Sequence, residues 1–253
     1  MEPVDAVILA AGRFRRDEAV RTGSEIKALI RVGNATPLEM ILAAVGHASS
    51  VRRIVVVGPS SIRTVVSGVD LWLDERSSGE ENALAGLRAA GTRRSLLCAS
   101  DLPFVTVSHV DDFLSRVPDD ADFAYPIYER EEFLAAFPGG RTKFARVGDA
   151  YWTGGSLCVV STELALANEQ MLRRCFTARR SQVAMASLLG WPILARHMLG
   201  RLSVEHVVQR LSRLTGGKAV AVLGAYPELA MDCDSMLDVD YVQKHGSVFE
   251  RHA

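Results

Sequence analysis

The fold is decided near the amino terminus by Val7-Ile8-Leu9-Ala10-Ala11-Gly12-Arg13-Phe14-Arg15-Arg16. The apolar run predicts a buried strand, and the small residues that end it let a ligand approach the main chain closely. Backbone N–H groups in such a turn can form an anion-binding nest, and arginines add bidentate contacts to phosphate. The stretch therefore indicates a loop that holds the phosphates of a nucleotide, although an arginine cluster can equally be a solvated surface.

Two familiar glycine-rich loops differ from this stretch in their spacing. The Walker pattern ends in Gly-Lys-Ser/Thr, and the dinucleotide pattern is Gly-x-Gly-x-x-Gly. Neither follows the apolar run here. A dinucleotide-dependent oxidoreductase is therefore disfavoured.

Composition limits the classes of protein that this chain can represent. It has 253 residues, of which 48% are hydrophobic, so it can bury a full core as one large α/β domain or two small ones. The formal net charge of −1 provides no general basic field for nucleic acid. The four cysteines have no Cys-x-x-Cys spacing, which argues against a zinc site and against a redox pair.

The sequence contains no apolar run of membrane-spanning length, and its start lacks the basic region and long apolar segment of a signal peptide. We therefore expect a soluble cytoplasmic protein that contacts neither a membrane nor nucleic acid. The sequence leaves open whether the protein forms a homodimer.

Strand-like and helix-like segments alternate along the first half of the chain. Near-continuous apolar runs predict strands covered on both faces, and capped apolar stripes predict helices between them. The expected strands are 4–10, 54–58, 69–73, 95–99 and 123–127, and the expected helices begin at Thr36, Gly79 and Thr106. This alternation predicts parallel strand pairs with right-handed crossovers.

The pattern changes in two places. Residues 13–26 are polar and predict a loop, and residues 27–32 resume an extended pattern. Residues 129–141 predict a mobile segment over a site. Further strands are expected at 143–147, 157–160 and 219–223, around a mainly helical stretch. Because no linker or repeat interrupts the chain, we expect one domain over residues 1–253 with a helical elaboration at about 161–215.

Asp101 follows the expected strand at 95–99 and precedes Leu102-Pro103. Ligands of open α/β sheets bind beyond the carboxyl ends of strands, and the Gly12 turn leaves another such end. In a parallel sheet the two features share an edge, so Asp101 is placed to hold Mg²⁺ against nucleotide phosphates. The alternative is that Asp101 only caps the next turn.

Asp232 and Asp234 are the other acidic candidates. Because they are two residues apart, their side chains would share one face of a strand, and both could approach one metal ion. The alternative is a solvated acidic turn ahead of the last helix. Together with Asp101 and the phosphate loop, at least one of them becomes a candidate second ligand.

Three further features each allow a functional and an ordinary interpretation. Lys27 can neutralise a leaving pyrophosphate or an α-phosphate, or it can be a surface lysine. Arg179 and Arg180 can contact an anion or form a solvated helix end. Tyr151-Trp152-Thr153-Gly154-Gly155 suits a wall for a second substrate, or a hairpin turn whose aromatic side chains enter the core.

Taken in order, the motifs resemble a known family. They are Leu9-Ala10-Ala11-Gly12 with its arginines, Lys27 followed by Ala-Leu-Ile, Ser100-Asp101-Leu102-Pro103, Thr153-Gly154-Gly155 and Met231-Asp232-Cys233-Asp234. Together they resemble the nucleotidyltransferases of the molybdenum cofactor guanylyltransferase type, the MobA-like NTP transferases. Sugar-phosphate nucleotidylyltransferases and isoprenoid-pathway cytidylyltransferases are relatives of that family. The resemblance spans nearly the whole chain.

The resemblance implies a Rossmann-like three-layer α/β/α sandwich of the glycosyltransferase-A type with a mostly parallel central sheet. It implies that the nucleotide is bound by Leu9, Ala10, Ala11, Gly12, Arg13, Gly79, Asn82 and Ser100. It further implies Mg²⁺ at Asp101 and Asp232, phosphate contacts from the catalytic residues Arg16 and Lys27, and an acceptor pocket lined by Thr153, Gly154 and Gly155.

The activity implied by the resemblance is transfer of an NMP unit from a nucleoside triphosphate, GTP or CTP, to a small phosphorylated acceptor, with release of pyrophosphate. Direct attack on the α-phosphorus needs no covalent enzyme intermediate, so catalysis would rest on positioning and charge stabilisation. A glycosyltransferase with a nucleotide-sugar donor is the rival on the same fold, although Asp101-Leu102-Pro103 stands in place of its usual Asp-x-Asp. A nucleotide-binding protein without catalysis is the third interpretation.

Overall fold

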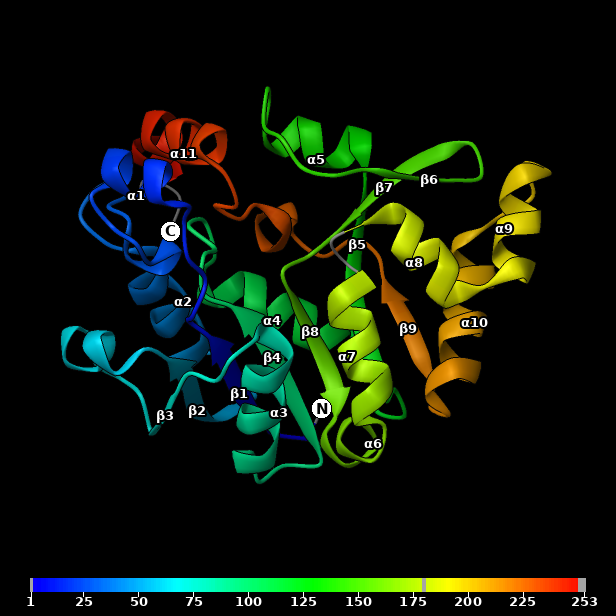
Figure 1. Cartoon of the computed structure of the whole chain (residues 1–253), viewed down its shortest axis with the longest axis horizontal. Coiled ribbons are helices and arrows are strands. Elements are labelled where there is room, and N and C mark those ends of the chain that lie inside the picture. Colours follow the sequence, from blue (N-terminus) through cyan, green and yellow to red (C-terminus); the bar gives the residue numbers. More distant parts are fainter. Residues whose placement is uncertain (1, 179–180, 250–253) are drawn as a thin grey trace.

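The computed structural model describes residues 2–178 and 181–249. A nine-stranded sheet runs through the centre of the protein (Figure 1). The strands lie in the order β3-β2-β1-β4-β8-β5-β7-β6, and β9 pairs with β5. Their bounds are β1 Val4–Leu9, β2 Val51–Gly58, β3 Leu71–Asp74, β4 Arg94–Ala99, β5 Phe123–Glu129, β6 Ala145–Val147, β7 Ala150–Gly154, β8 Leu157–Ser161 and β9 Ala219–Val222.

The first four strands form a parallel half-sheet with β1 at its centre. Leu9 at the end of β1 lies opposite Val57 of β2 and Ala99 of β4. Strand β8 pairs antiparallel with both β4 and β5, so the predicted fifth strand is not a neighbour of the fourth. Only β7 and β8 run against the direction shared by the other described strands. The predicted mostly parallel sheet is confirmed.

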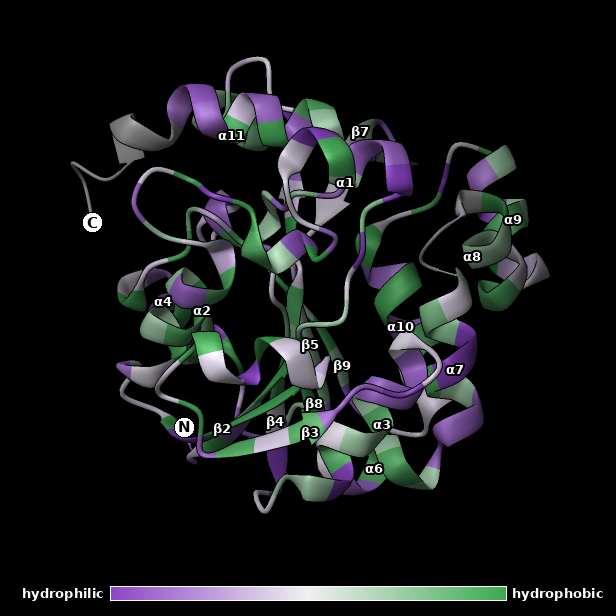
Figure 2. Cartoon of the chain, turned by 60° about the vertical axis from the view of Figure 1, so that its left-hand side comes forward, coloured by the Kyte–Doolittle hydropathy of each residue, from purple (hydrophilic) through white to green (hydrophobic). Residues whose placement is uncertain are grey.

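Helices cover both faces of the sheet. Helices α2 (Pro37–Gly46) and α4 (Val107–Arg116) pack over the face that carries Ile8. Helices α3 (Gly79–Ala89) and α7 (Glu169–Ala178) pack over the opposite face, which carries Val7. Alternate residues of β1 are therefore buried on opposite sides, which is why the strand reads as a near-continuous apolar run. Figure 2 shows the apolar strands enclosed between the helices, so the three-layer α/β/α architecture is also confirmed.

The chain forms a run of helices between β8 and β9. These are α6 (Thr162–Ala167), α7, α8 (Gln182–Leu189), α9 (Trp191–Met198) and α10 (Val204–Thr215). Ser203 caps α10, because its hydroxyl accepts a hydrogen bond from the His206 N–H (3.4 Å). Helices α8 to α10 surround a small apolar core of their own, built on Leu189, Ile193 and Leu202. None of the helices in the described part of the chain is long and apolar enough to cross a membrane.

Two predictions near the amino terminus are wrong. Residues 13–26 contain helix α1 (Arg16–Thr22), which starts with a bond from the Arg15 N–H to the Glu18 carboxylate (3.0 Å) and ends at Gly23. Residues 27–32 are not extended throughout, because they begin with the 3₁₀-helix η1 (Lys27–Leu29). Helix α1 buries no residue, so it has no apolar stripe that the sequence could display.

The remaining regular structure comprises helix α5, strand β7, two 3₁₀-helices and the final helix. The segment expected to be mobile contains helix α5 (Arg130–Ala136), which buries Phe133. Strand β7, which pairs with β5 and β6, lies in a stretch that the sequence did not identify as a strand. The 3₁₀-helices η2 (Ser60–Val65) and η3 (Pro227–Ala230) and the final helix α11 (Met236–Phe249) account for the other regular structure.

Candidate functional site

The Gly12 turn and Asp101 leave neighbouring strands at the same edge of the sheet. Strands β1 and β4 are parallel, with Leu9 opposite Ala99. Beyond this pair the Ser100 hydroxyl donates to the Leu9 carbonyl (2.9 Å). Ser100 is buried. The carboxyl ends of the two strands are therefore fastened together, and the turn and the acidic residue emerge side by side.

The chain returns along the Gly12 turn and brings Lys27 against it. The Lys27 N–H donates to the Gly12 carbonyl (2.9 Å), and the Phe14 N–H donates to the Glu25 carbonyl (3.0 Å). A Cβ atom on Gly12 would meet nothing closer than Lys27 Cδ at 3.6 Å. Packing within the protein therefore does not require glycine at this position, so the absence of a side chain leaves the main chain open to a ligand.

Lys27 forms the ionic centre of the site. Its Nζ donates to the Asp234 carboxylate and to the Asp234 carbonyl, each at 2.8 Å. Burial alone would lower the pKa of Lys27, but the bond and charge of Asp234, together with the charges of Asp101 and Asp232, raise the pKa instead. The lysine is therefore a fixed cation facing three carboxylates.

Asp232 and Asp234 have different surroundings. They lie between η3 and α11 rather than in a strand, so the expectation that they share one strand face is wrong. Asp232 is half-buried and accepts a hydrogen bond from the Ser156 hydroxyl (2.7 Å), whereas Asp234 is exposed and pairs with Lys27. Burial and the charges of Asp101 and Asp234 raise the pKa of Asp232 well above its ordinary value. Asp232 is therefore the carboxyl that shares an environment with Asp101.

The main chain joins the segment that carries Asp232 to the end of β4. The Cys233 N–H donates to the Asp101 carbonyl (3.1 Å), and the Ala99 N–H donates to the Ser156 carbonyl (2.8 Å). Asp101 is itself half-buried. Three segments that are far apart in the sequence and that contain Asp101, Ser156 and Asp232 therefore meet at one point.

This donor set suits a hard divalent cation. Mg²⁺ takes oxygen ligands, and in nucleotide sites it commonly uses one or two carboxylates with the remaining positions filled by phosphates and water. The charge repulsion felt by Asp232 beside Asp101 is what such a cation would relieve. Across residues 2–178 and 181–249 no group of three or more His, Cys, Asp or Glu side chains is arranged to hold a metal. A site completed by substrate oxygens needs only the two carboxylates.

The arginines after Gly12 face in different directions. Arg13 forms an ion pair with Glu75, which follows β3, with a bond of 2.6 Å between Nη1 and Oε2. That bond raises the pKa of Arg13. Arg15 pairs with Glu18 within α1. Arg16 is the first residue of α1 and is exposed.

Gly79 and Asn82 lie at the start of α3, beyond the end of β3. Ser78 caps the helix by accepting a bond from the Glu81 N–H (3.3 Å), and Gly79 is the first helical residue. The buried Asn82 side chain accepts a bond from the Arg76 N–H (2.5 Å). Asn82 thus shapes the loop that runs from Glu75 to the helix.

Thr153, Gly154 and Gly155 lie where β7 ends and the chain turns into β8. Thr153 is buried, and its hydroxyl lies 3.1 Å from that of Thr142. A Cβ on Gly154 would stand 2.3 Å from the Tyr125 ring, and one on Gly155 would stand 2.7 Å from Pro126. Both glycines are therefore needed for close packing against β5, independently of any substrate.

The structure brings together Gly12, Lys27, Ser100, Asp101 and Asp232 from the predicted site. The sequence did not single out Ser156 or Glu75, which hold Asp232 and Arg13. Ser156 directly follows the paired glycines, and this position was the only signal that it belongs to the site. Arg179 and Arg180 lie outside the described residues.

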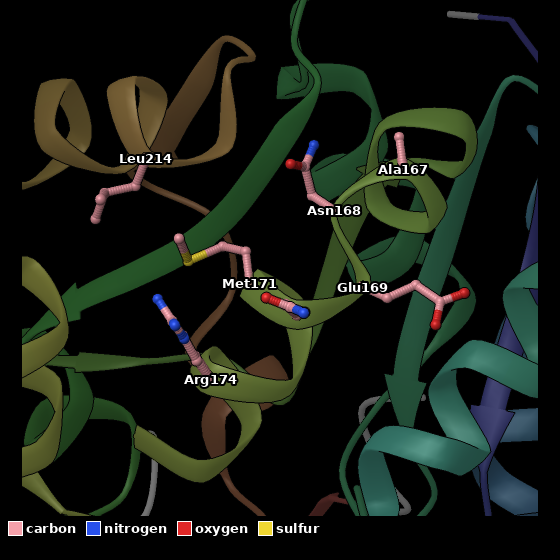
Figure 3. Close-up of a pocket in the computed structure, with 7 residues that line it drawn as sticks. Ala167, Asn168, Glu169, Met171, Arg174 and Leu214 are labelled. Carbon is pink, nitrogen blue, oxygen red and sulfur yellow. The ribbon is translucent and has the colours of Figure 1, made fainter.

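Two hollows lie away from this edge. The one in Figure 3, of about 410 Å³, is lined by Asn168, which lies between α6 and α7, by Met171 and Arg174 of α7 and by Leu214 of α10. A second, of about 620 Å³, lies where α2 ends and β2 begins, at the amino edge of the strands. Neither contains a residue of the predicted site, and ligands of such sheets bind at the carboxyl edge.

Comparison with known proteins identifies related sequences. Residues 6–196 match the family model of the MobA-like NTP transferase domain. A protein named "probable molybdenum cofactor guanylyltransferase" from Mycobacterium ulcerans is 32% identical over 158 residues, which cover 60% of this chain and 77% of that protein.

Solved structures show the same architecture. A hypothetical transferase from Thermus thermophilus superposes with a TM-score of 0.81 at 31% identity, covering 94% of this chain and all of the other. The 4-diphosphocytidyl-2C-methyl-D-erythritol synthase of Anaerococcus prevotii superposes with a TM-score of 0.61 at 14% identity, covering 97% of this chain and 96% of that one. The second likeness concerns the fold alone.

Proposed function

The chain belongs to the MobA-like NTP transferase family and is a nucleotidyltransferase, and on that premise we propose that its reaction is Mg²⁺-dependent and uses a phosphorylated acceptor. An NMP unit passes from a nucleoside triphosphate to a phosphate oxygen of the acceptor, and pyrophosphate leaves. The observation that carries this proposal is the meeting of Lys27, Asp101 and Asp232 beside the Gly12 turn.

The two half-buried carboxylates are the proposed metal ligands. Asp101 comes from the end of β4, and Asp232 is held in place by Ser156. When bound, the cation supplies charge neutralisation for the triphosphate and orients its phosphates. The two carboxylates fix its place at the edge of the sheet, next to the loop that takes the phosphates.

The main chain around Gly12 and the cations Lys27 and Arg16 are the proposed phosphate contacts. Leu9, the last residue of β1, and Ala10, Ala11 and Arg13 lie on either side of Gly12 and are the other proposed nucleotide contacts. A phosphate on this loop lies within the reach of a lysine that the structure already fixes at the turn. Lys27 and Arg16 then stabilise the charge that develops on the α-phosphate and on the leaving pyrophosphate. The acceptor attacks directly, so no side chain of the protein forms a covalent bond to the nucleotide.

Asp234 is the residue that orients the Lys27 side chain. Its carboxylate and carbonyl accept two bonds from the same Nζ, so the lysine is oriented before any nucleotide binds. A phosphate competes with the exposed carboxylate for this cation. We therefore assign Asp234 to positioning and Asp232 to the metal.

The base and the acceptor take the two flanks of this centre. The start of α3, with Gly79 and Asn82, is the proposed base side, and Thr153, Gly154 and Gly155 are the proposed acceptor side. GTP or CTP is the proposed nucleotide, and GTP is supported by the Mycobacterium ulcerans relative, which is named as a guanylyltransferase.

Thermal-shift measurements with each of the four ribonucleoside triphosphates and Mg²⁺ test nucleotide choice. A ligand at about 100 times its Kd adds about 2.7 kcal/mol, which for a chain of this size raises Tm by about 5–10 °C. The triphosphate that does so is then incubated with a panel of sugar, polyol and pterin phosphates while pyrophosphate release is followed. Asp101→Ala is expected to abolish that release, and full activity in this variant would rule the mechanism out.

The same assays separate the rival functions. Release of a nucleoside diphosphate from nucleotide sugars, without pyrophosphate release from any triphosphate, would indicate a glycosyltransferase. A large thermal shift with a triphosphate, but no pyrophosphate release with any acceptor in the panel, would favour a binding protein without catalysis.

A further inference from the structure

Helix α9 and the turn after it expose large apolar side chains. Trp191, Leu194, Met198 and Leu199 are 69%, 37%, 71% and 70% exposed. The first three are spaced by three and four residues, so they share one face of the helix. Ile193, on the other side, is buried in the small core of the helical elaboration. One face thus anchors α9 to the protein while the opposite face presents an apolar stripe.

Two arginines are fixed at the end of this stripe. The Arg201 N–H donates to the Arg196 carbonyl (2.8 Å), and the Gly200 N–H donates to the His197 carbonyl (3.0 Å), with Gly200 at φ 65°. This pair of bonds is the Schellman arrangement that closes a helix. These bonds bring the backbones of Arg196 and Arg201 together at the end of the helix, and both arginines are exposed, as are Met198 and Leu199.

Basic side chains predominate in residues 170–218, whereas acidic side chains predominate in the rest of the chain. Residues 170–218 contain nine lysines and arginines and a single acidic residue, Glu205, so their formal charge is +8. The remaining residues contain 20 basic and 29 acidic side chains, a formal charge of −9. The near-neutral total conceals this separation. The apolar stripe therefore lies in a segment of net positive charge, which favours contact with an anionic surface.

The stripe also lies at an end of the molecule. Figure 1 places α9 at one extreme of the longest axis, and Figure 2 shows α8 and α9 at the rim, away from the sheet. The elaboration packs on β6 through Val147. A surface contact at α9 therefore leaves the carboxyl edge of the sheet uncovered and lies on the side of β7, which carries Thr153 and Gly154.

We propose that α9 and the turn after it, residues 191–201, dock on an anionic lipid surface. Trp191, Leu194, Met198 and Leu199 enter the headgroup region, and Arg196 and Arg201 contact lipid phosphates. Tryptophan at the interface, apolar residues on one helix face and arginines beside them are the features of an interfacial helix. The expectation of no membrane contact rested on the lack of a spanning segment, and an interfacial contact needs none. This inference does not depend on the nucleotidyl transfer reaction.

Sedimentation with lipid vesicles tests the proposal on the full chain. The protein is expected to sediment with mixed phosphatidylcholine–phosphatidylglycerol vesicles, to stay in solution with pure phosphatidylcholine vesicles, and to be released by added salt. The emission of Trp191 is expected to shift to the blue on binding, and the shift is expected to disappear in Trp191→Phe.

Two double variants identify the surface. Arg196→Glu/Arg201→Glu and Met198→Ser/Leu199→Ser are each expected to weaken partition to the anionic vesicles by about tenfold or more. Arg63→Glu and Val20→Ser, which alter an exposed arginine and an exposed valine elsewhere, serve as matched controls and are expected to bind as the parent protein does. Melting temperatures close to that of the parent show that the variants fold.

Three outcomes would overturn the proposal. One is no sedimentation with anionic vesicles, and another is sedimentation that the two double variants leave unchanged. The third is a self-associating species, seen by analytical ultracentrifugation without lipid and lost in Met198→Ser/Leu199→Ser, because a second copy of the chain would then cover the stripe.

Discussion

At the scale of single residues, Lys27 connects the Gly12 turn with the segment that carries Asp232 and Asp234. Its main chain bonds to Gly12, and its side chain bonds to Asp234, which is 207 residues further along. Lys27→Met is expected to lower kcat by about a hundredfold or more, because one preorganised charge contact to the transition state is lost. Stability is expected to fall as well, because Asp101, Asp232 and Asp234 lose the cation that they face. Steady-state kinetics and thermal melting, with Lys244→Met as the surface control, measure both effects.

A second prediction separates the two neighbouring carboxylates. Asp232→Asn is expected to remove the stabilisation that Mg²⁺ with the triphosphate gives, while the protein without ligand stays at least as stable, because the repulsion from Asp101 is relieved. Asp234→Asn is expected to keep that stabilisation and lower kcat, because Lys27 loses its aim. Melting curves with and without Mg²⁺ and nucleotide measure the difference. If the two variants exchange these phenotypes, the assignment of metal ligand and positioning residue is reversed.

The sequence predicted which residues form the candidate site better than it predicted which residues they bond to. Gly12 and Asp101 could be placed at one edge because parallel strands put their carboxyl ends together. The pairing of Lys27 with Asp234 could not be predicted, because it joins two segments whose contact depends on how η3 and α11 return over the sheet. Ser156 was missed for the same reason, since its role appears only when the Asp232 segment reaches it.

At the scale of elements, the long buried strands were predictable, and the short exposed elements were not. β1 and the second half of β2 are buried on both faces and carry the near-continuous apolar runs that such strands need. Helix α1 has seven residues, none of them buried, and β7 presents Tyr151 and Trp152 among polar and small residues. β8 lies between β4 and β5 in the sheet. This order could not be predicted from the local sequence pattern, because it depends on contacts between residues far apart in the sequence.

Two glycine turns provide a matched prediction. Gly12→Ala is expected to leave stability within about 0.5 kcal/mol of the parent, because the added Cβ meets nothing closer than 3.6 Å. It is expected to weaken triphosphate binding, because the methyl group would stand where we propose that the phosphates approach the main chain. Gly154→Ala is expected to cost about 1–3 kcal/mol of stability, because its Cβ would stand 2.3 Å from Tyr125. Urea unfolding and nucleotide titration of both variants distinguish a turn kept for a ligand from one kept for packing.

At the scale of the whole molecule, one buried carboxylate ties the amino edge of the sheet together. Asp5 of β1 is fully buried and accepts bonds from Arg52 Nε (2.9 Å), Arg53 Nη2 (3.1 Å) and the Gly91 N–H (2.7 Å). These partners come from β2 and from the connection between α3 and β4. Burial by itself would raise the pKa of Asp5, but the bonds from Arg52 and Gly91 and the two arginine charges lower it below 3.8.

The sign of the resulting pH dependence follows from linkage. A carboxyl whose pKa is lower in the folded protein binds fewer protons there than in the unfolded chain, so it contributes stability above pH 3.8 that is lost as pH falls through the folded value. Asp5→Asn is expected to cost about 1–3 kcal/mol at neutral pH and to flatten the loss of stability in acid, because Arg52, Arg53 and the Gly91 N–H lose a charged acceptor. Asp5 lies at the edge opposite the candidate site, so kcat below the melting temperature is expected to stay unchanged. Urea unfolding from pH 3 to 7, with exposed Asp240→Asn as the control, measures this, and an unaltered acid limb in Asp5→Asn would show that other carboxylates govern acid stability.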